Sequence, residues 1–387
     1  MNLTKNIVLK NFKVTRKINK KIKFNLSKIL KEKNEIIKSL GSSYKYSFKR
    51  SNYLKFKKIN CVNLIGIGGS ILGAKSIYSF LNNKIKKNFF FFDKFVSKKN
   101  FENKKKINLI ISKSGNTLET IVNSNIMINK NDHNIFLTEN KNSYLTKMAN
   151  KLKAEIINHN NFIGGRYSVL SEVGMLPAQL MGLNIDKFKK FNILIKDNNF
   201  HNSLIRGVTN ILMLVNKKKN NSIILNYDSN SEDLLKWYQQ LVAESLGKKN
   251  KGIMPIISNM PQDNHSVMQL YLDGPKNNFF TFFYVIDDNS LKINNEKLLT
   301  SYSYLKNKNI HDIKFAQYIA TQNVFKKKDI PFRSFFIKKR NEETLGELFS
   351  YFILETILLG SVMKLNPYDQ PAVELIKINT KKILTKA

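Results

Sequence analysis

Two consecutive segments of this chain share one pattern: an apolar strand, a turn of small residues and an amphipathic helix. The first reads CVNLIGIGGSILGAKSIYSFL (61–81) and the second reads INLIISKSGNTLETIVNSNIMI (107–128). Unbroken apolar runs are typical of strands that are buried on both faces of a parallel sheet. Because parallel strands are joined through a crossover helix, the two units predict an open α/β sheet with a ligand site at its carboxyl edge.

The turns of both units carry groups that bind anions. In the first turn, Gly69 lets the backbone approach a ligand, and Ser70 can cap the next helix or donate its hydroxyl to an anion. The second turn brings hydroxyls and backbone N–H groups to a helix N-terminus, where the helix dipole favours phosphate. Its residues are Ser112, Lys113, Ser114, Gly115 and Thr117. For Ser112 or Thr117 alone an ordinary helix cap is the favoured interpretation, but two such turns in succession favour a phosphate site.

The segment WYQQLVAESLGK (237–248) predicts a buried helix that ends at Gly247. Within it Gln240 and Glu244 lie one turn apart and therefore stand on the same face. Burial raises the pKa of a carboxyl group towards the range that a general base needs, which makes Glu244 the first candidate for catalysis. The alternative is that Glu244 is exposed to solvent or pairs with Lys248.

Three more segments carry polar residues suited to chemistry. Arg166 follows a Gly-Gly turn that is expected to expose its guanidinium, a fixed cation that can stabilise an anionic oxygen. His265 lies in a polar turn before a short helix. Gln370, Glu374 and Lys377 fall three or four residues apart, on one face if a helix begins by Gln370. Each has a structural alternative: a surface salt bridge for the arginine, a cap or surface position for the histidine, and solvent for the lysine.

Composition narrows the classes of partner. The 387 residues carry a formal net charge of +37, but lysine is spread evenly along the chain together with asparagine and isoleucine. This indicates a general compositional bias rather than a binding stripe, so no specific nucleic-acid partner is predicted, although the charge would attract phosphorylated substrates. The single cysteine, Cys61, excludes an intramolecular disulfide and a multi-cysteine metal site.

The N-terminus shows no signal-peptide pattern, and the most apolar stretch, SYFILETILLGSVMKL (350–365), is interrupted by Glu355 and is shorter than a bilayer requires. We therefore expect a cytoplasmic protein with no membrane partner. The expected domain organisation is a basic arm over residues 1–45 with one or two helices, a first domain over 46–195, and a second domain with a C-terminal helix over 196–387.

Six motifs together resemble the phosphoglucose isomerase family. In chain order they are GIGGS (66–70), SKSGNT (112–117), GGRYSVLSEVG (164–174), QQLVAESLGK (239–248), DNHS (263–266) and NPYDQPAVELIK (366–377). The resemblance implies an α/β fold of two sugar-isomerase (SIS) domains with flavodoxin-like topology, in which helices flank parallel sheets. It also implies reversible aldose–ketose isomerisation of glucose 6-phosphate and fructose 6-phosphate, in glycolysis and gluconeogenesis, without a metal or cofactor.

The resemblance assigns roles to individual residues. Glu244 becomes the base that moves a proton between C2 and C1 of the sugar, and Arg166 faces the enediolate that forms on the way. His265 and Lys377 help to open the sugar ring. The histidine comes from the neighbouring subunit in the family, which implies a homodimer with shared active sites. The substrate is held by Gly69, Ser70, Ser112, Ser114, Thr117, Gln240 and Gln370, with backbone N–H groups from Lys113 and Gly115.

Other functions stay open at this point. A non-catalytic SIS domain can bind a sugar phosphate as a regulator, but such a protein is expected to lack the glutamate, the histidine and the terminal lysine together, whereas this chain has all three. A dual phosphoglucose and phosphomannose isomerase is not distinguished by the sequence. A nicotinamide-dependent oxidoreductase is disfavoured, because Ile71 occupies the third glycine position of the dinucleotide fingerprint.

Overall fold

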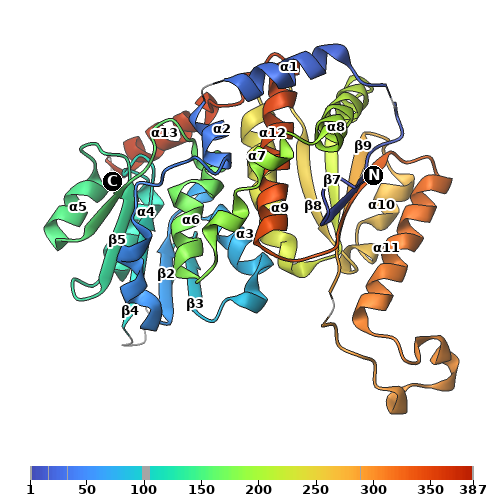
Figure 1. Ribbon diagram of the computed structural model, residues 1–387, viewed down its shortest axis with the longest axis horizontal. Coiled ribbons are helices and arrows are strands. Elements are labelled where there is room, and N and C mark those ends of the chain that lie inside the picture. Colours follow the sequence, from blue (N-terminus) through green and yellow to red (C-terminus); the bar gives the residue numbers. More distant parts are fainter. Residues whose placement is uncertain (1, 16, 33, 98–104, 288, 386–387) are drawn as a thin grey trace.

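The computed structural model describes residues 2–385 except 16, 33, 98–104 and 288. Two five-stranded sheets lie side by side, with a layer of helices between them (Figure 1). Four helices of this layer pack against one another: α3 (Leu72–Phe80), α6 (Glu172–Leu180), α9 (Glu232–Leu246) and α12 (Glu342–Val362). This arrangement confirms the predicted α/β class, in which helices flank parallel sheets.

The first sheet is parallel throughout and has the strand order β3-β2-β4-β5-β6. A chain that steps to one side and then returns past its first strand has the flavodoxin-like order. Ile65 at the end of β2 pairs with Ile110 near the end of β4, so the turns after these strands lie next to each other at the carboxyl edge. The strands are β2 (Cys61–Ile65), β3 (Asn88–Phe92), β4 (Lys106–Ile111), β5 (His133–Thr138) and β6 (Glu155–Asn158), followed or joined by α4 (Leu118–Met127) and α5 (Tyr144–Leu152).

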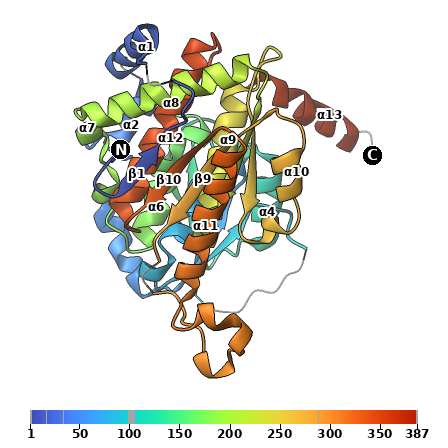
Figure 2. The same ribbon diagram turned by 90° about the vertical axis from the view of Figure 1, so that its right-hand side faces the viewer.

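The second sheet has the order β1-β10-β9-β7-β8. Four of its strands are parallel: β7 (Asn221–Asn226), β8 (Met254–Asn259), β9 (Asn278–Val285) and β10 (Phe332–Ile337). The fifth, β1 (Ile7–Lys10), comes from the N-terminal segment and runs antiparallel to β10 (Figure 2). Sequence reasoning did not find β1, because a four-residue edge strand carries almost no periodic signal. The predicted domain boundaries stay a prediction.

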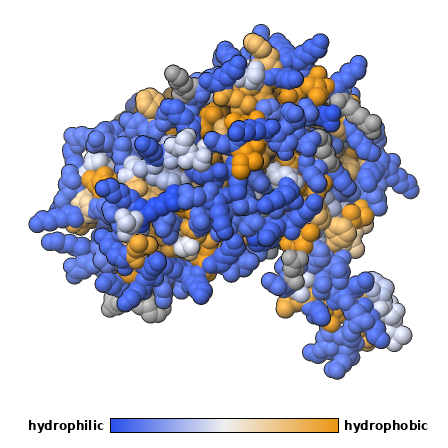
Figure 3. Space-filling view, viewed as in Figure 1, coloured by the Kyte–Doolittle hydropathy of each residue, from blue (hydrophilic) through white to orange (hydrophobic). Residues whose placement is uncertain are grey.

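The remaining helices lie around these layers. They are α1 (Lys20–Lys31), α2 (Glu35–Leu40), α7 (Phe191–Leu194), α8 (Asn198–Asn216), α10 (Met268–Asp273), α11 (Ile310–Lys327) and α13 (Glu374–Leu384). Between β9 and α11 the chain makes an excursion that projects from the body (Figure 1), and α13 projects at another side (Figure 2). The face shown in Figure 3 is mostly hydrophilic, with hydrophobic side chains gathered at its upper centre, between the two sheets.

Helix α12 forms the centre of the core. It spans 21 residues and includes the most apolar stretch of the sequence as far as Val362. By length and composition alone the helix could cross a membrane, but 89% of its apolar window is buried inside the protein. It packs against α1, α8, α9 and the 185–194 segment. Its apolar character is therefore explained by its place in the core.

One ion pair is buried beside this helix. Arg333 of β10 and Glu355 of α12 have side chains that are each 1% exposed. The guanidinium donates through both terminal nitrogens to the carboxylate, with Nη2 and Oε2 3.0 Å apart, and through Nε to the hydroxyl of Thr281 at 3.1 Å. The hydroxyl of Tyr238, on α9, lies 3.4 Å from Nη2. These contacts join the second sheet to α9, the helix predicted to carry the catalytic carboxylate.

Replacing Glu355 by glutamine should destabilise the fold by about 3 kcal/mol or more, because Arg333 would keep a buried charge without a counter-charge. Glu232→Gln is the matched control. Glu232 pairs with Lys236 at side-chain exposures of 39% and 45%, and exposed pairs contribute about 1 kcal/mol at most. Urea unfolding followed by circular dichroism measures both variants. Equal unfolding midpoints would contradict the expectation.

Candidate active site

The second turn has the form expected of a phosphate cradle. Ser112 is 1% exposed, and its hydroxyl lies 2.8 Å from that of Thr117. Thr117 occupies the N-cap position of α4, yet its side chain makes no capping hydrogen bond. The alternative that these residues are ordinary caps therefore does not hold for Thr117. The N-terminus of α4 is therefore a candidate anion site, and phosphate binding at this turn stays a prediction.

Other groups in this turn are already engaged. Gly115 has a φ of +65°, and a side chain there would collide with the hydroxyl of Ser143 at 2.1 Å, so only glycine fits. Its N–H donates to the carbonyl of Ser112 at 3.1 Å. Its role as a phosphate donor stays a prediction. The hydroxyl of Ser114 accepts from the N–H of Asn116. Burial lowers the pKa of Lys113, and its ammonium lies 3.7 Å from Glu139.

The first turn approaches protein backbone rather than open space. A Cβ on Gly69 would lie 2.2 Å from the carbonyl carbon of Gly165, so this turn packs directly on the Gly-Gly turn before Arg166. A Cβ on the neighbouring Gly68 would lie 2.9 Å from the amide nitrogen of Gln240. Helix α3 begins at Leu72, so Ser70 precedes the helix and makes no cap for it. The glycines therefore bring the first sheet, the Gly-Gly turn and α9 into contact.

Arg166 is buried, which corrects the expectation that the Gly-Gly turn exposes it. The residue is 2% exposed, and its Nη1 donates to Glu244 Oε2 at 3.2 Å and to Gln370 Oε1 at 2.5 Å. The other nitrogens donate to the carbonyls of Pro367 and Asp369 and to the hydroxyl of Ser245. The reason is that these acceptors come from distant parts of the chain and close over the guanidinium. The alternative of a surface salt bridge is equally wrong.

Glu244 lies on α9 as predicted, and each of its carboxylate oxygens has a partner. Oε1 accepts from the amide of Gln240 at 2.7 Å, and Oε2 accepts from Arg166. The side chain is 28% exposed, so a small molecule can reach it. The alternative pairing with Lys248 does not occur, because Lys248 pairs with Asp369 at 2.5 Å. An oriented carboxylate next to a fixed cation is suited to moving a proton while negative charge develops nearby.

Of three other predicted residues, one reaches Arg166 and two are exposed. Gln370 precedes a short 3-10 turn (Pro371–Val373), and α13 begins only at Glu374. Gln370 therefore does not share a helical face with Lys377, although it does reach Arg166. Lys377 pairs with Glu374 at 2.6 Å on an exposed helix, and His265 is exposed after another short 3-10 turn. Among the described residues, no hydrogen bond or ion pair joins His265 or Lys377 to Glu244 or Arg166.

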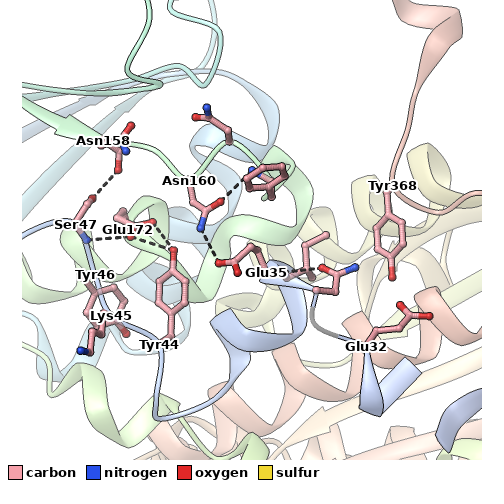
Figure 4. Close-up of a pocket in the computed structure, with 14 residues that line it drawn as sticks. Glu32, Glu35, Tyr44, Lys45, Tyr46, Ser47, Asn158, Asn160, Glu172 and Tyr368 are labelled. Carbon is pink, nitrogen blue, oxygen red and sulfur yellow. Dashed lines mark hydrogen bonds between the residues drawn. The ribbon is translucent and has the colours of Figure 1, made fainter. Parts of the chain in front are cut away.

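Two cavities lie near this site. One of about 770 Å³ borders Glu244 and Gln370. A larger one of about 970 Å³ is lined by Tyr368 and by three carboxylates, and by none of the predicted site residues (Figure 4). Its lining glutamates are Glu32, Glu35 and Glu172. Burial raises the pKa of Glu172, which accepts from Tyr44. An acidic lining repels a phosphorylated ligand, which makes the cavity at Glu244 the better candidate.

Sequence reasoning missed two residues of the site, Ser245 and Tyr167. Both are fully buried and belong to the hydrogen bonds around Arg166. Ser245 directly follows Glu244 in the chain, and Tyr167 directly follows Arg166. Their place inside two of the motifs that carry the resemblance was the available signal, since a buried serine and a buried tyrosine are ordinary core residues in sequence.

Solved structures place the fold in a known class. The chain aligns with a TM-score of 0.83 to a hypothetical protein of Thermus thermophilus, at 22% identity and 94% coverage of both chains. It aligns with a TM-score of 0.68 to a glucose-6-phosphate isomerase of Chlamydia trachomatis, at 18% identity over 95% of this chain and 73% of that one. The chain thus has the two-sheet fold found in sugar-phosphate isomerases.

Sequence relatives identify the family. The sequence model of phosphoglucose isomerase matches residues 2–387. A glucose-6-phosphate isomerase of Mycoplasmopsis pulmonis is 35% identical over 92% of this chain and 88% of its own length. One of Methanocaldococcus jannaschii is 33% identical over 84% of both chains. The chain belongs to the phosphoglucose isomerase family.

Inorganic phosphate should raise the melting temperature of this protein by binding the second turn. The double variant Ser112→Ala, Thr117→Val should lose most of that shift, because it removes both hydroxyls. Asn309→Ala serves as control: Asn309 caps α11, beside the second sheet, so its loss should lower the melting temperature but leave the phosphate-induced shift unchanged. Differential scanning fluorimetry over a phosphate titration measures this. A full shift in the double variant would move the anion site elsewhere.

Proposed function

We propose that the protein interconverts glucose 6-phosphate and fructose 6-phosphate, in glycolysis and gluconeogenesis. The observation that carries the proposal is the carboxylate of Glu244, held between the amide of Gln240 and the guanidinium of Arg166 at 2.7 and 3.2 Å. The names of the relatives from Mycoplasmopsis pulmonis and Methanocaldococcus jannaschii support the same activity.

The substrate binds with its phosphate at the second turn, where Ser112, Thr117 and the N-terminus of α4 hold the anion. The sugar then extends into the cavity beside Glu244 and Gln370. Glu244 removes the proton from C2 and returns it to C1, so that the intermediate is a cis-enediolate. Arg166 stabilises the negative oxygen of that intermediate, because its charge is fixed and its donors are oriented before the substrate arrives. Gln240 and Gln370 position the reacting carbons.

Ring opening requires groups that this chain alone does not bring to the site. His265 and Lys377 are exposed, and α13 presents apolar side chains to solvent, including Leu375 at 67%, Ile376 at 71% and Ile383 at 68% exposure. Exposed apolar residues of this kind are typical of an interface. A homodimer in which each subunit supplies His265 to its partner's site accounts for both observations. The enzyme acts in the cytoplasm, a location supported by the burial of its most apolar helix.

Glu244→Gln should fold normally and lose isomerase turnover by on the order of a hundredfold or more, because the amide cannot accept the proton. Conversion of fructose 6-phosphate to glucose 6-phosphate, with EDTA present, measures this for the variant, the wild type and Glu232→Gln. The last carries the same change at an exposed position of the same helix. Near wild-type turnover in Glu244→Gln would remove the residue from this role. A wild type that is only stabilised by the sugar phosphate would be a binding protein.

Shared sites can be tested by complementation. His265→Ala and Glu244→Gln should each be inactive as homodimers, whereas a mixed dimer has one site with both residues intact and one with neither. Random association of equal amounts should therefore restore about a quarter of the wild-type activity. Co-expression with two affinity tags isolates the mixed dimer, which should have about half. No recovery in the purified mixed dimer would mean that each chain forms its own site.

A further inference from the structure

Arg166 belongs to a closed ring of buried hydrogen bonds. Its Nε donates to Ser245 Oγ at 2.8 Å, and Ser245 Oγ lies 2.8 Å from the hydroxyl of Tyr167. That hydroxyl donates to the carbonyl of Pro367 at 2.9 Å. The same carbonyl accepts from Arg166 Nη2 at 2.7 Å, which closes the ring. Ser245 and Tyr167 are each 0% exposed, so neither touches a ligand.

The hydrogens in this ring can run in one direction only. A guanidinium donates and never accepts, and a carbonyl accepts and never donates. Ser245 must therefore accept from Arg166 and give its own hydrogen to Tyr167, which gives its hydrogen to Pro367. Each hydroxyl is used once as acceptor and once as donor. Loss of either hydroxyl leaves a buried donor or acceptor of the ring without a partner.

The ring divides the five N–H donors of Arg166 into two groups. Three point to acceptors that are held in place: the buried hydroxyl of Ser245 and the backbone carbonyls of Pro367 and Asp369, of which Asp369 also borders the cavity. The other two, both on Nη1, point to the side chains of Glu244 and Gln370, which border the open cavity. Nη1 is thus the edge of the guanidinium that can be transferred to a ligand oxygen.

We propose that Ser245 and Tyr167 are positioning residues, which fix the guanidinium plane so that Nη1 faces the reacting oxygen of the substrate. This inference rests on the proposed function, because it assumes that Arg166 stabilises the enediolate. A fixed donor costs no reorganisation when charge develops, so the ring contributes to turnover more than to substrate binding.

Ser245→Ala and Tyr167→Phe should each lower kcat for fructose 6-phosphate by on the order of tenfold to a hundredfold, with KM changed by about threefold or less. A phosphorylated aldonic acid, whose carboxylate resembles the enediolate, should lose affinity in parallel with kcat. Because both hydroxyls act in one ring, the double variant should cost little more than either single change. Ser350→Ala is the matched control: Ser350 is 0% exposed on α12 and its hydroxyl has no hydrogen-bond partner among the described residues.

The outcomes separate the ring from the reaction itself. An inactive wild-type protein would contradict the proposed function, and the positioning role of the ring would fall with it. With an active wild type, variants that melt at lower temperature but keep full kcat would reduce Ser245 and Tyr167 to structural residues. Losses in kcat that simply multiply in the double variant would mean that the two hydroxyls act separately. If Ser245→Ala fails to fold, the kcat of Tyr167→Phe tests the proposal, since phenylalanine keeps the aromatic group of Tyr167 and removes only its hydroxyl.

Discussion

The site depends on the burial of one permanent charge. A guanidinium cannot give up its proton at any accessible pH, so moving it out of water is tolerable only when its donors are satisfied. Arg166 is 2% exposed and has an acceptor for each of its donors, drawn from α9 and from residues 367–370. Those segments have to converge on the first sheet's Gly-Gly turn. The relative placement of the two sheets at this point follows from that requirement.

Glycines in two turns of the first sheet allow these segments to come close together. The turn after β2 and the turn before Arg166 touch at Gly69 and Gly165, where a Cβ would lie 2.2 Å from backbone. The same turn meets Gln240 of α9 at Gly68. On the far face of α9, Tyr238 contacts the buried pair of Arg333 and Glu355. Helix α9 is thus fixed on both faces, and the carboxylate that it carries has little freedom to move.

Local patterns in the sequence predicted most of the sheets and the strand-turn-helix form of residues 107–128, because strand, turn and helix are encoded by neighbouring residues. The predictions that failed concern features that depend on residues far apart in the sequence. Arg166 was expected at the surface, but its acceptors on Ser245 and Gln370 lie 79 and 204 residues away. Ser245 and Tyr167 look like ordinary core residues until that ring closes. Strand β1 was not predicted, because only its pairing with β10 makes it a strand.

His265 and Lys377 illustrate a different limit. Buried groups such as Arg166 and Ser245 are held by one chain, and their contacts can be traced within it. A residue that meets the sugar only after a second chain has docked has no reason to be buried beforehand, since burying an unpaired polar group is costly. In a single chain it is therefore indistinguishable from a surface residue. Exposure of His265, together with the apolar surface of α13, agrees with the proposed homodimer, in which this residue would complete the partner's site.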